Sequence, residues 1–560
     1  MGTPRSHADS TGPAGFPGKF SGPGLAVLLV VFLTLALPLG GILWAGWLDT
    51  RSFPAFLDRA QAVLTRGSTW RSTGFSFFQA GVSAALTLVL AIPGSYALAR
   101  YTFKGKGFIQ ALGMASFVLP SLLIILAVMS FYGRAGVLNQ ILGTRFSFVY
   151  SPVGIILAHL MFNLAIGLRM LTQGWLDLDQ RLVDASRSLG DSSLGRLRRL
   201  ALPFLGRRMV SAFLLIFLYC FLSFSIVLIF GGVGFITLEV LIYREMYVSL
   251  SPAGAAVLVL LQLLVTGLVV ALSQFWGRSV QRGARPVEVK PMGSLSFPSR
   301  ILWGLYWTLV YLFLLAPLGA LMFRSFWDDG ALGFAAYRSL FLGTGGRGTG
   351  PGIFEVMRAT TGQVFLDSLV LALSSGTASV LLGYLVARLL SRRDFSGSDT
   401  LFLLPLVVSG VTLSLGMGQV LSSFVSRWIL IVLVQTVMAF PLVFRIFREG
   451  FRSFPPSYQE AAKSLGAGTW FRIRTLELPL LWPIGLQAFA FGAAISLGDF
   501  TGVYTLGRGE VVTVPIAMFR LIGFQHFPAA LALGVCYIMV TLGVFLLIDS
   551  FDRRKKEGRI

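Results

Sequence analysis

The sequence predicts an all-α polytopic membrane protein of about 12 transmembrane helices, arranged as two parallel six-helix repeats. Three observations predict this class. The 560 residues are 55% hydrophobic and only 12% charged, whereas a soluble protein carries about 25% charged residues. Apolar runs of about 20 residues, long enough to cross a bilayer, recur along the whole chain. Motifs of the first half also return 276 residues later, as from His159 to Gln435.

Six apolar windows are candidate spans in each half. They lie at approximately 24–47, 75–99, 108–131, 152–175, 209–231 and 252–276, and then at 301–323, 364–389, 399–422, 427–448, 481–500 and 528–549. Because each repeat has an even number of spans, both halves have the same orientation. The repeats are then related by an axis along the membrane normal, and a transport path is expected near that axis.

The formal net charge of +22 would suit a protein that binds nucleic acid. We exclude nucleic acid as a partner because most Arg and Lys residues lie in short loops between the apolar runs. Such loops determine topology through the positive-inside bias. The basic stretches 177–208, 277–300 and 550–560 fall on one side, which is predicted to be cytoplasmic. Both termini are then cytoplasmic, in a multi-pass protein of the plasma or inner membrane.

Two loops, each between the fourth and fifth span of its half, carry the most specific motif. The first contains Asp184-Ala185-Ser186-Arg187-Ser188-Leu189-Gly190 and then Leu202-Pro203; the second contains Glu460-Ala461-Ala462-Lys463-Ser464-Leu465-Gly466 and then Leu478-Pro479. We call residues 184–203 and 460–479 the paired loops. In both, the acid precedes the glycine by six residues, and the glycine precedes the proline by thirteen.

This spacing predicts a short amphipathic helix, a turn at the glycine and a second helix. Glycine tolerates positive φ and ends the first helix. The proline is expected to break the second helix before the chain re-enters the membrane. Alanine keeps the first helix narrow enough to enter a groove on a partner, and an acid near its N-terminus is favoured by the helix dipole. The alternative is an ordinary interfacial helix.

The paired loops resemble the EAA loop of binding-protein-dependent ABC importer permeases. Within these, the chain is similar to the fused thiamine and ferric-iron permeases, through the segments 132–138 (YGRAGVL), 157–164 (LAHLMFNL) and 497–500 (LGDF). The resemblance implies the type I ABC importer permease fold, in which the loop is a coupling helix seated in a cleft of the ATPase subunit. The first copy departs from the pattern, with Asp184 for Glu and Ser186 for the second Ala.

The resemblance also implies partners and substrate. These are two copies of a cytoplasmic ABC ATPase, an extracytoplasmic solute-binding protein, and thiamine or its phosphates as solute, with ferric iron as the alternative. The domains are then a flexible cytoplasmic tail (1–23), the first permease half (24–276), a cytoplasmic linker (277–300), the second permease half (301–549) and a basic cytoplasmic tail (550–560).

No catalytic residue, cofactor or metal is predicted in the chain itself. The sequence has no G-x-x-x-x-G-K-[ST] segment for nucleotide phosphates, so ATP-Mg belongs to the partner ATPase and the chain is not an enzyme. The two cysteines, Cys220 and Cys536, lie in apolar runs without metal-ligand spacing.

Polar and aromatic residues at membrane depth are candidates for the solute path. They are Asp499, Phe500, Tyr504, Ser223, Phe224, His159 and Asn163. Asp499 has Ser223 as its repeat counterpart, so its carboxylate belongs to one half only. It either attracts a cationic solute beside aromatic faces or caps a turn that begins at Thr501. His159 and Asn163 share a helix face, where they line the path or bond between helices.

Two rival functions belong to other classes. A secondary transporter can also have twelve spans in two parallel repeats, but it would use intramembrane acids or ions for coupling. Few charges at membrane depth, together with the paired loops, argue against it. An intramembrane enzyme would need a paired nucleophile and base or a metal cluster, and His159 has no such partner in the sequence.

Overall fold

The computed structural model describes most of the chain. The described residues are 30, 32–109, 120–146, 148–232, 234–277, 289–328, 331–343, 351–391, 408–453 and 456–556. The predicted tail 1–23, most of the linker (278–288), and parts of the first, third and ninth predicted spans (24–29, 110–119 and 399–407) lie outside these residues.

The described part of the first half contains helices and one two-residue strand. Its elements are η1 (Phe32–Ala36), α2 (Leu37–Thr50), α3 (Phe53–Thr65), α4 (Gly67–Arg100), β1 (Tyr101–Thr102), α6 (Ser121–Tyr132), α7 (Val137–Leu142), α8 (Pro152–Leu176), α9 (Gln180–Ser188), α10 (Ser193–Arg196), η2 (Leu197–Ala201), α11 (Leu202–Phe221), α12 (Ser225–Phe230), α13 (Leu238–Tyr247) and α14 (Pro252–Gly277). Strand β1 pairs in parallel with β2 (Lys290–Pro291), so the end of α4 is tied to the segment that enters the second half.

The described part of the second half is also mainly helical. Its elements are η3 (Met292–Ser294), α15 (Phe297–Ser325), the antiparallel pair β3 (Trp327–Asp328) and β4 (Ala331–Leu332), α16 (Ala335–Leu342), α17 (Ile353–Met357), α18 (Thr361–Ser391), α19 (Gly410–Leu421), α20 (Arg427–Arg452), α21 (Pro456–Ser464), α22 (Thr469–Arg472), η5 (Ile473–Glu477), α23 (Leu478–Gly498), α24 (Thr501–Leu506), α25 (Val514–Gly523) and α26 (Phe527–Lys556). The series α8 to α14 recurs as α20 to α26, helix for helix.

Within the described residues, ten helical segments are long and apolar enough to cross a membrane. They are Phe32–Thr50, Gly67–Arg100, Ser121–Leu142, Pro152–Leu176, Arg198–Phe221, Pro252–Ser273, Phe297–Ser325, Ile353–Leu390, Arg427–Arg452 and Thr469–Gly498. The other two predicted spans are 399–422 and 528–549. In the described residues they correspond to the shorter apolar helix α19 (Gly410–Leu421) and to α26. The prediction of an all-helical polytopic membrane protein is confirmed.

The prediction that the fifth span, 209–231, is a single helix was wrong. Helix α11 ends at Phe221, and the short helix α12 begins only at Ser225. The same break separates α23 from α24 in the second half. Because α12 is as apolar as the span before it, hydrophobicity alone does not reveal the turn between them.

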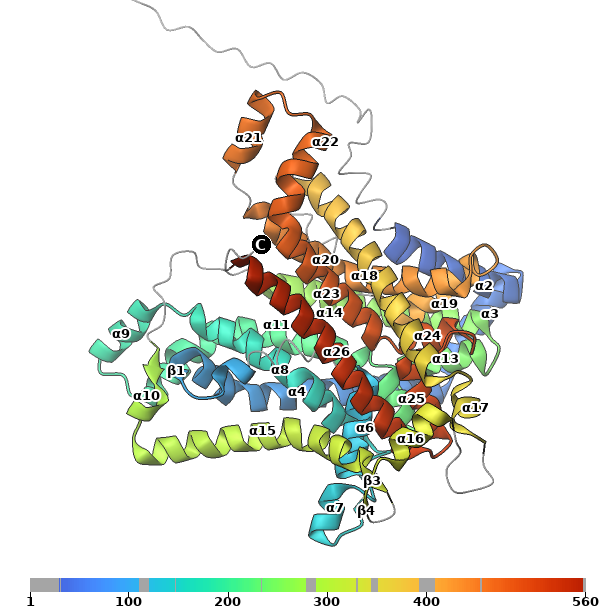
Figure 1. Ribbon diagram of the computed structural model, residues 1–560, viewed down its shortest axis with the longest axis horizontal. Helices are drawn as coiled ribbons and strands as arrows, with labels where there is room; N and C mark the ends of the chain where they lie inside the picture. The colour runs from blue at the N-terminus through green and yellow to red at the C-terminus, as the bar shows by residue number, and fades with distance from the viewer. Residues whose placement is uncertain are drawn as a thin grey trace, which may run out of the picture.

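The two halves are interleaved through their first helices. Helices α4, α8 and α11 pack together in the first half, as α18, α20 and α23 do in the second (Figure 1). Helix α2, however, packs on α19 of the second half, and α15 packs on α6 of the first half. A Cβ added at Gly416 of α19 would lie 1.9 Å from the Pro38 carbonyl oxygen of α2. Glycine thus permits the close helix approach that is common in membrane interfaces.

Candidate functional site

Each paired loop is a helix, a glycine turn and a second helix. In the first loop, α9 is capped by Asp179, whose side chain accepts from the Arg181 N–H, and Gly190 follows with a φ of 78°. In the second loop, Gly466 follows α21 with a φ of 73°. A Cβ at either glycine would meet nothing within 4 Å. The turn therefore requires glycine for its backbone conformation and not for space.

The turns present two leucines that sequence reasoning did not single out. Leu189 and Leu465, which are 276 residues apart, are each 86% exposed. An exposed leucine at the same place in both repeats is typical of a contact surface, because burying it on a partner is favourable. The second loop also exposes Trp470 and Phe471, which add to its apolar surface.

The sequence predicted that the prolines of the paired loops break the second helix, and this prediction was wrong. Pro203 and Pro479 lie in the first turn of α11 and α23, and the chain before each forms a π-helical turn, η2 and η5, that continues from α10 and α22. The wider turn leaves out the hydrogen bond that a proline cannot donate. The helix therefore continues through the proline into the membrane.

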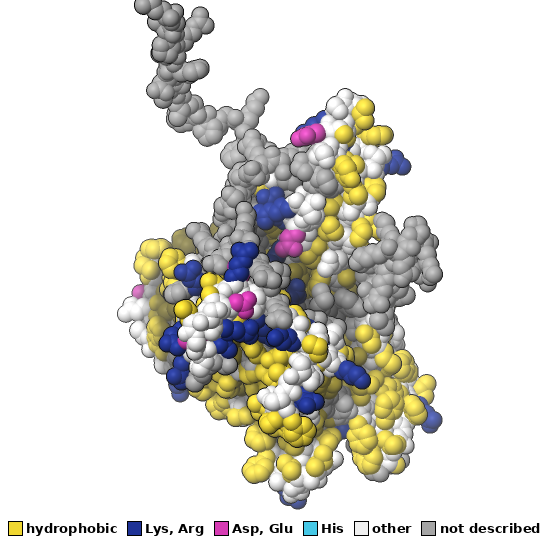
Figure 2. Space-filling view, turned by 90° about the vertical axis from the view of Figure 1, so that its left-hand side faces the viewer, with side chains coloured by type: hydrophobic (Ala, Val, Ile, Leu, Met, Phe, Trp, Pro, Cys, Tyr) yellow, Lys and Arg dark blue, Asp and Glu magenta, His cyan; other side chains and the backbone are white. Residues whose placement is uncertain are grey.

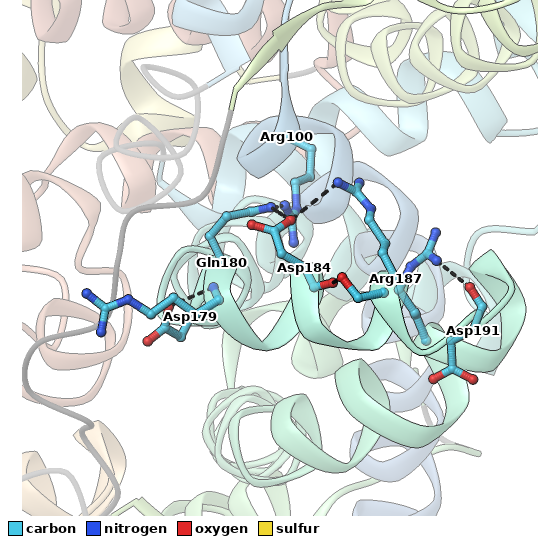
Figure 3. A network of polar contacts seen from close by, with 9 residues as sticks. Arg100, Asp179, Gln180, Asp184, Arg187 and Asp191 are labelled. Atoms are coloured by element: carbon cyan, nitrogen blue, oxygen red, sulfur yellow. Dashed lines mark hydrogen bonds and ion pairs between the residues drawn. The ribbon is translucent and has the colours of Figure 1, made fainter.

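The acidic residues of the two loops differ in their surroundings. Asp184 Oδ1 accepts from Gln180 Nε2 at 2.9 Å and lies 3.5 Å from Arg187 Nη1 (Figure 3). Its counterpart Glu460 is exposed, and among the described residues it has no hydrogen-bond or ion-pair partner. Glu460 is thus the freer of the two to pair with a cation on a partner.

Basic side chains surround the first loop. Figure 2, which views the molecule from the side of α9, shows Lys and Arg side chains gathered on this face with a few acidic ones among them. Some of these charges pair locally: Arg199 contacts Asp191, and Arg208 Nη2 lies 2.7 Å from Asp177 Oδ2. One ion pair thus lies within the first paired loop, and the other joins the chain segments before and after it.

The second candidate site is a cluster of aromatic rings between the halves. Phe224 of the first half lies 6.3 Å from Phe500 and 6.0 Å from Tyr504 of the second half, between ring centroids. Phe500 and Tyr504 stack at 4.9 Å. Three of the predicted path residues are thus brought together across the boundary between the repeats.

Two further members of this cluster were missed by sequence reasoning. Tyr243 lies 5.4 Å from Tyr504, and Phe519 lies 5.2 Å from both Phe500 and Tyr504. The signal for them was available, because Tyr243 and Phe519 are related by the 276-residue repeat, as Phe224 and Phe500 are. Aromatic residues that occupy equal positions of two parallel repeats are expected to meet near the axis.

A cavity of about 440 Å³ adjoins the aromatic cluster. Its aromatic lining comes from Tyr243, Tyr504, Phe519 and Phe524. Its charged lining comprises Arg358, Arg508, Arg520 and Glu355. The cavity therefore combines aromatic faces with an excess of guanidinium groups, a combination that accepts both rings and anionic groups.

Asp499 does not line this cavity. It is buried, and its Oδ1 accepts from the Gly502 N–H at 2.9 Å while its Oδ2 accepts from Gln435 Nε2 at 3.1 Å. The bond from the Gly502 N–H caps α24, because it satisfies a backbone donor in the first turn of that helix. Gln435 in turn accepts from Ser375 and Ser496. The carboxylate thus joins α20, α23 and α24 in one buried polar network.

The first half has a polar network with longer contacts around His159, the repeat counterpart of Gln435. His159 Nδ1 lies 3.4 Å from Ser83 Oγ of α4, and Asn163 Nδ2 lies 3.4 Å from Cys220 Sγ of α11. Both contacts join helices, and both residues are buried. Ser223 begins the turn between α11 and α12, and its N–H donates to the Cys220 carbonyl at 3.3 Å. The structure therefore places His159 and Asn163 between helices and away from the aromatic cluster.

The chain was compared with known proteins. Residues 351–557 match a family described as "Binding-protein-dependent transport system inner membrane component". The thiamine transport system permease protein ThiP of Brucella suis biovar 1 is 27% identical over 505 residues, covering 87% of this chain and 89% of that protein. ThiP of Salmonella typhimurium is 28% identical over 538 residues, covering 92% and 96%.

A shorter relative aligns with part of the chain. The molybdenum transport system permease protein ModB of Haemophilus influenzae is 33% identical over 218 residues, covering 34% of this chain and 94% of that protein. Nearly the whole of this relative thus aligns with about a third of this chain. The chain belongs to the family of binding-protein-dependent transport system inner membrane components.

Proposed function

We propose that this permease carries thiamine or its phosphates inward, powered by two copies of an ABC ATPase that dock on the paired loops. The observation that carries the proposal is the duplication of those loops. Each has a helix, a glycine at positive φ and an 86% exposed leucine at the same place in its repeat. A movement of the two ATPase subunits would then pass to both halves through α9 and α21.

Elementary energetics supports this docking. Burying Leu189 and Leu465 in clefts of the ATPase would gain about 2 kcal/mol each by removal of apolar surface from water. Because the glycine turns position these leucines, a side chain at Gly190 or Gly466 would strain the turn. A left-handed backbone costs an ordinary residue about 1–2 kcal/mol. The face bearing the paired loops is then cytoplasmic, in line with its basic residues and the positive-inside bias.

The choice of solute is supported by the names of the relatives and by the cavity beside the aromatic cluster. Thiamine is an aromatic cation, and its phosphates add anionic groups. The rings of Tyr243, Tyr504 and Phe519 suit the aromatic part, and the guanidinium groups of Arg358 and Arg520 suit a phosphate. The excess of positive charge therefore favours the thiamine phosphates over the thiamine cation. A binding protein on the opposite face from the paired loops would deliver the solute to this cavity.

The experiment is ATP-dependent uptake by the permease reconstituted with its ATPase and binding protein. Gly466→Ala and Gly190→Ala should lower both uptake and solute-stimulated ATP hydrolysis severalfold. Gly468→Ala and Gly206→Ala are the matched controls, because a Cβ there also meets nothing within 4 Å and neither glycine has a positive φ. Intact coupling in the Gly190→Ala, Gly466→Ala double variant would refute docking through these loops.

The solute is tested in the same vesicles. Labelled thiamine, thiamine monophosphate, thiamine diphosphate and ferric iron are offered separately, each at saturation of its own binding protein. Uptake of a thiamine compound supports the proposal, and uptake of iron alone would overturn it.

A further inference from the structure

The two repeats differ at one buried position close to the paired loops. In the second half, Glu477 ends η5 and is the partner of Arg388 at the end of α18. Arg388 Nε lies 2.6 Å from Glu477 Oε2, and the Tyr384 hydroxyl donates to the same oxygen at 3.0 Å. Both members of the ion pair are largely buried, with side-chain exposures of 16% and 10%. The carboxylate thereby links α18 to the start of α23.

The first half has the same arrangement of partners without the carboxylate. Tyr96 and Arg100 stand where the second half has Tyr384 and Arg388, four residues apart in both cases. Tyr96 lies edge-to-face against Trp175 at 5.0 Å, and Tyr384 lies against Phe451, the counterpart of Trp175, at 5.8 Å in a tilted arrangement. The position of Glu477, however, is occupied in the first half by Ala201, which is buried.

Arg100 consequently has a different set of contacts from Arg388. Its Nη1 donates to the neutral amide oxygen of Gln180 at 3.0 Å (Figure 3). Its Nε is buried and, among the described residues, has no hydrogen-bond partner. The equivalent Nε of Arg388 is the atom that binds Glu477 most closely. A buried donor without an acceptor is costly. The Asp184 carboxylate acts on Arg100 electrostatically but bonds to Gln180 and Arg187, so Arg100 lacks the directly bonded carboxylate that Arg388 has.

A cavity occupies the place where that anion would lie. It measures about 370 Å³ and is lined by both Arg100 and Ala201. Arg187, Arg196 and Lys290 add further positive charge, and no Asp or Glu is among the described residues that line it. Tyr96, Trp175 and Trp303 form aromatic walls. The lining therefore suits an oxyanion attached to an apolar or aromatic body.

We propose that the first half binds a phosphate-bearing ligand in this cavity, with its oxyanion at the position that the Glu477 carboxylate occupies in the second half. Phosphate suits the site because guanidinium groups bind it with charge-assisted hydrogen bonds. The ligand is either a soluble phosphate compound or the headgroup of an anionic phospholipid. This binding does not depend on the proposed transport function, since it concerns only the chain's own residues.

The ligand would also touch the first paired loop. Gln180, Val183 and Arg187 of α9 line the cavity together with Arg100 of α4. An occupied cavity would join α9 to the end of α4 through a shared anion, as Glu477 joins α18 to α23. The bound anion would add to the hydrogen bond between Arg100 and Gln180, which already connects α9 to the end of α4.

The experiment measures binding to the purified full chain. Its unfolding midpoint and Trp fluorescence are followed in neutral detergent during titration with inorganic phosphate at constant ionic strength. They are also compared in nanodiscs of phosphatidylcholine with and without phosphatidylglycerol. A response to phosphate identifies a soluble source, and a response to phosphatidylglycerol alone identifies a lipid source; either result supports the site.

The critical variant is Ala201→Glu, which places in the first half the carboxylate that the second half has. It should raise the unfolding midpoint without ligand and weaken the binding of phosphate or phosphatidylglycerol by at least about tenfold, roughly 1.4 kcal/mol. Ala201→Gln, the neutral control, should weaken binding without raising the midpoint. The proposal is overturned if neither probe binds, or if Ala201→Glu binds as tightly as the unaltered chain.

Discussion

Phe224 and Phe500 stack across the boundary between the two halves, with ring centroids 6.3 Å apart and planes inclined by 25°. The two residues hold the same position in their repeats, 276 residues apart. A contact between equivalent residues of two related units lies at the axis that relates them. The pair therefore lies at the axis that relates the two halves of the permease.

Replacing Phe500 by alanine should destabilise the contact between the halves. Phe500 is almost fully buried, and loss of a buried phenyl ring costs about 3–5 kcal/mol. The unfolding midpoint of the purified chain should fall clearly, whereas that of Phe424→Ala, whose ring is 81% exposed, should not. A double-mutant cycle with Phe224→Ala should give a coupling of about 0.5–1.5 kcal/mol. Strict additivity would show that the two rings do not interact.

The close approach of α2 and α19 should be sensitive to a single methyl group. A Cβ at Gly41 would lie 2.1 Å from the Gly416 carbonyl oxygen, but a Cβ at the adjacent Gly40 would meet nothing within 4 Å. Gly41→Ala should therefore separate the two helices and lower the unfolding midpoint. Gly40→Ala should leave the midpoint unchanged or raise it slightly, because alanine favours a helix by about 1 kcal/mol over glycine. Equal effects of the two variants would contradict the packing described for α2.

Two ion pairs of the second half should differ in what they contribute. Glu477→Gln removes the charge from the largely buried pair with Arg388 and should cost about 3 kcal/mol, because the guanidinium is left without its counter-ion. Glu449→Gln removes an exposed pair with Arg445, in which both side chains are more than 60% exposed, and should cost at most about 0.5 kcal/mol. Chemical unfolding of the purified variants compares them directly, and a larger loss for Glu449→Gln would refute this assignment.

Asp499→Ser tests whether the carboxylate holds α24 or meets the solute. The substitution copies the first half, where Ser223 stands at this position. If the carboxylate supports α24, as its bonds to Gly502 and Gln435 indicate, stability should fall by about 1–3 kcal/mol. Maximal uptake should then fall, with little change in the solute concentration for half-maximal uptake. A large rise in that concentration at unchanged stability would instead place Asp499 in the solute path.

Local patterns in the sequence were enough to predict the class of the protein and the form of the paired loops. A membrane span requires a long apolar run, and the turn at Gly190 or Gly466 requires a residue that tolerates positive φ. Both requirements involve residues that are neighbours in the chain, so they can be recognised in the sequence alone. The 276-residue repeat added the symmetry, which relates Phe224 to Phe500 before any coordinates are known.

The tertiary structure alone decided which residues meet across the membrane domain. It placed α2 on the opposite half, brought Tyr243 and Phe519 into the aromatic cluster, turned Asp499 toward Gly502, and carried the helices through Pro203 and Pro479 by a π-helical turn. It also showed that the Glu477 carboxylate binds Arg388 in the second half, whereas Ala201 stands at the equivalent position near Arg100 in the first half. These features depend on the crossing of helices that are far apart in the chain, where a shift of one residue or one methyl group changes the partner. Periodicity and composition carry no information about that geometry. The sequence by itself therefore determined the helices and turns, and packing determined which of their residues meet.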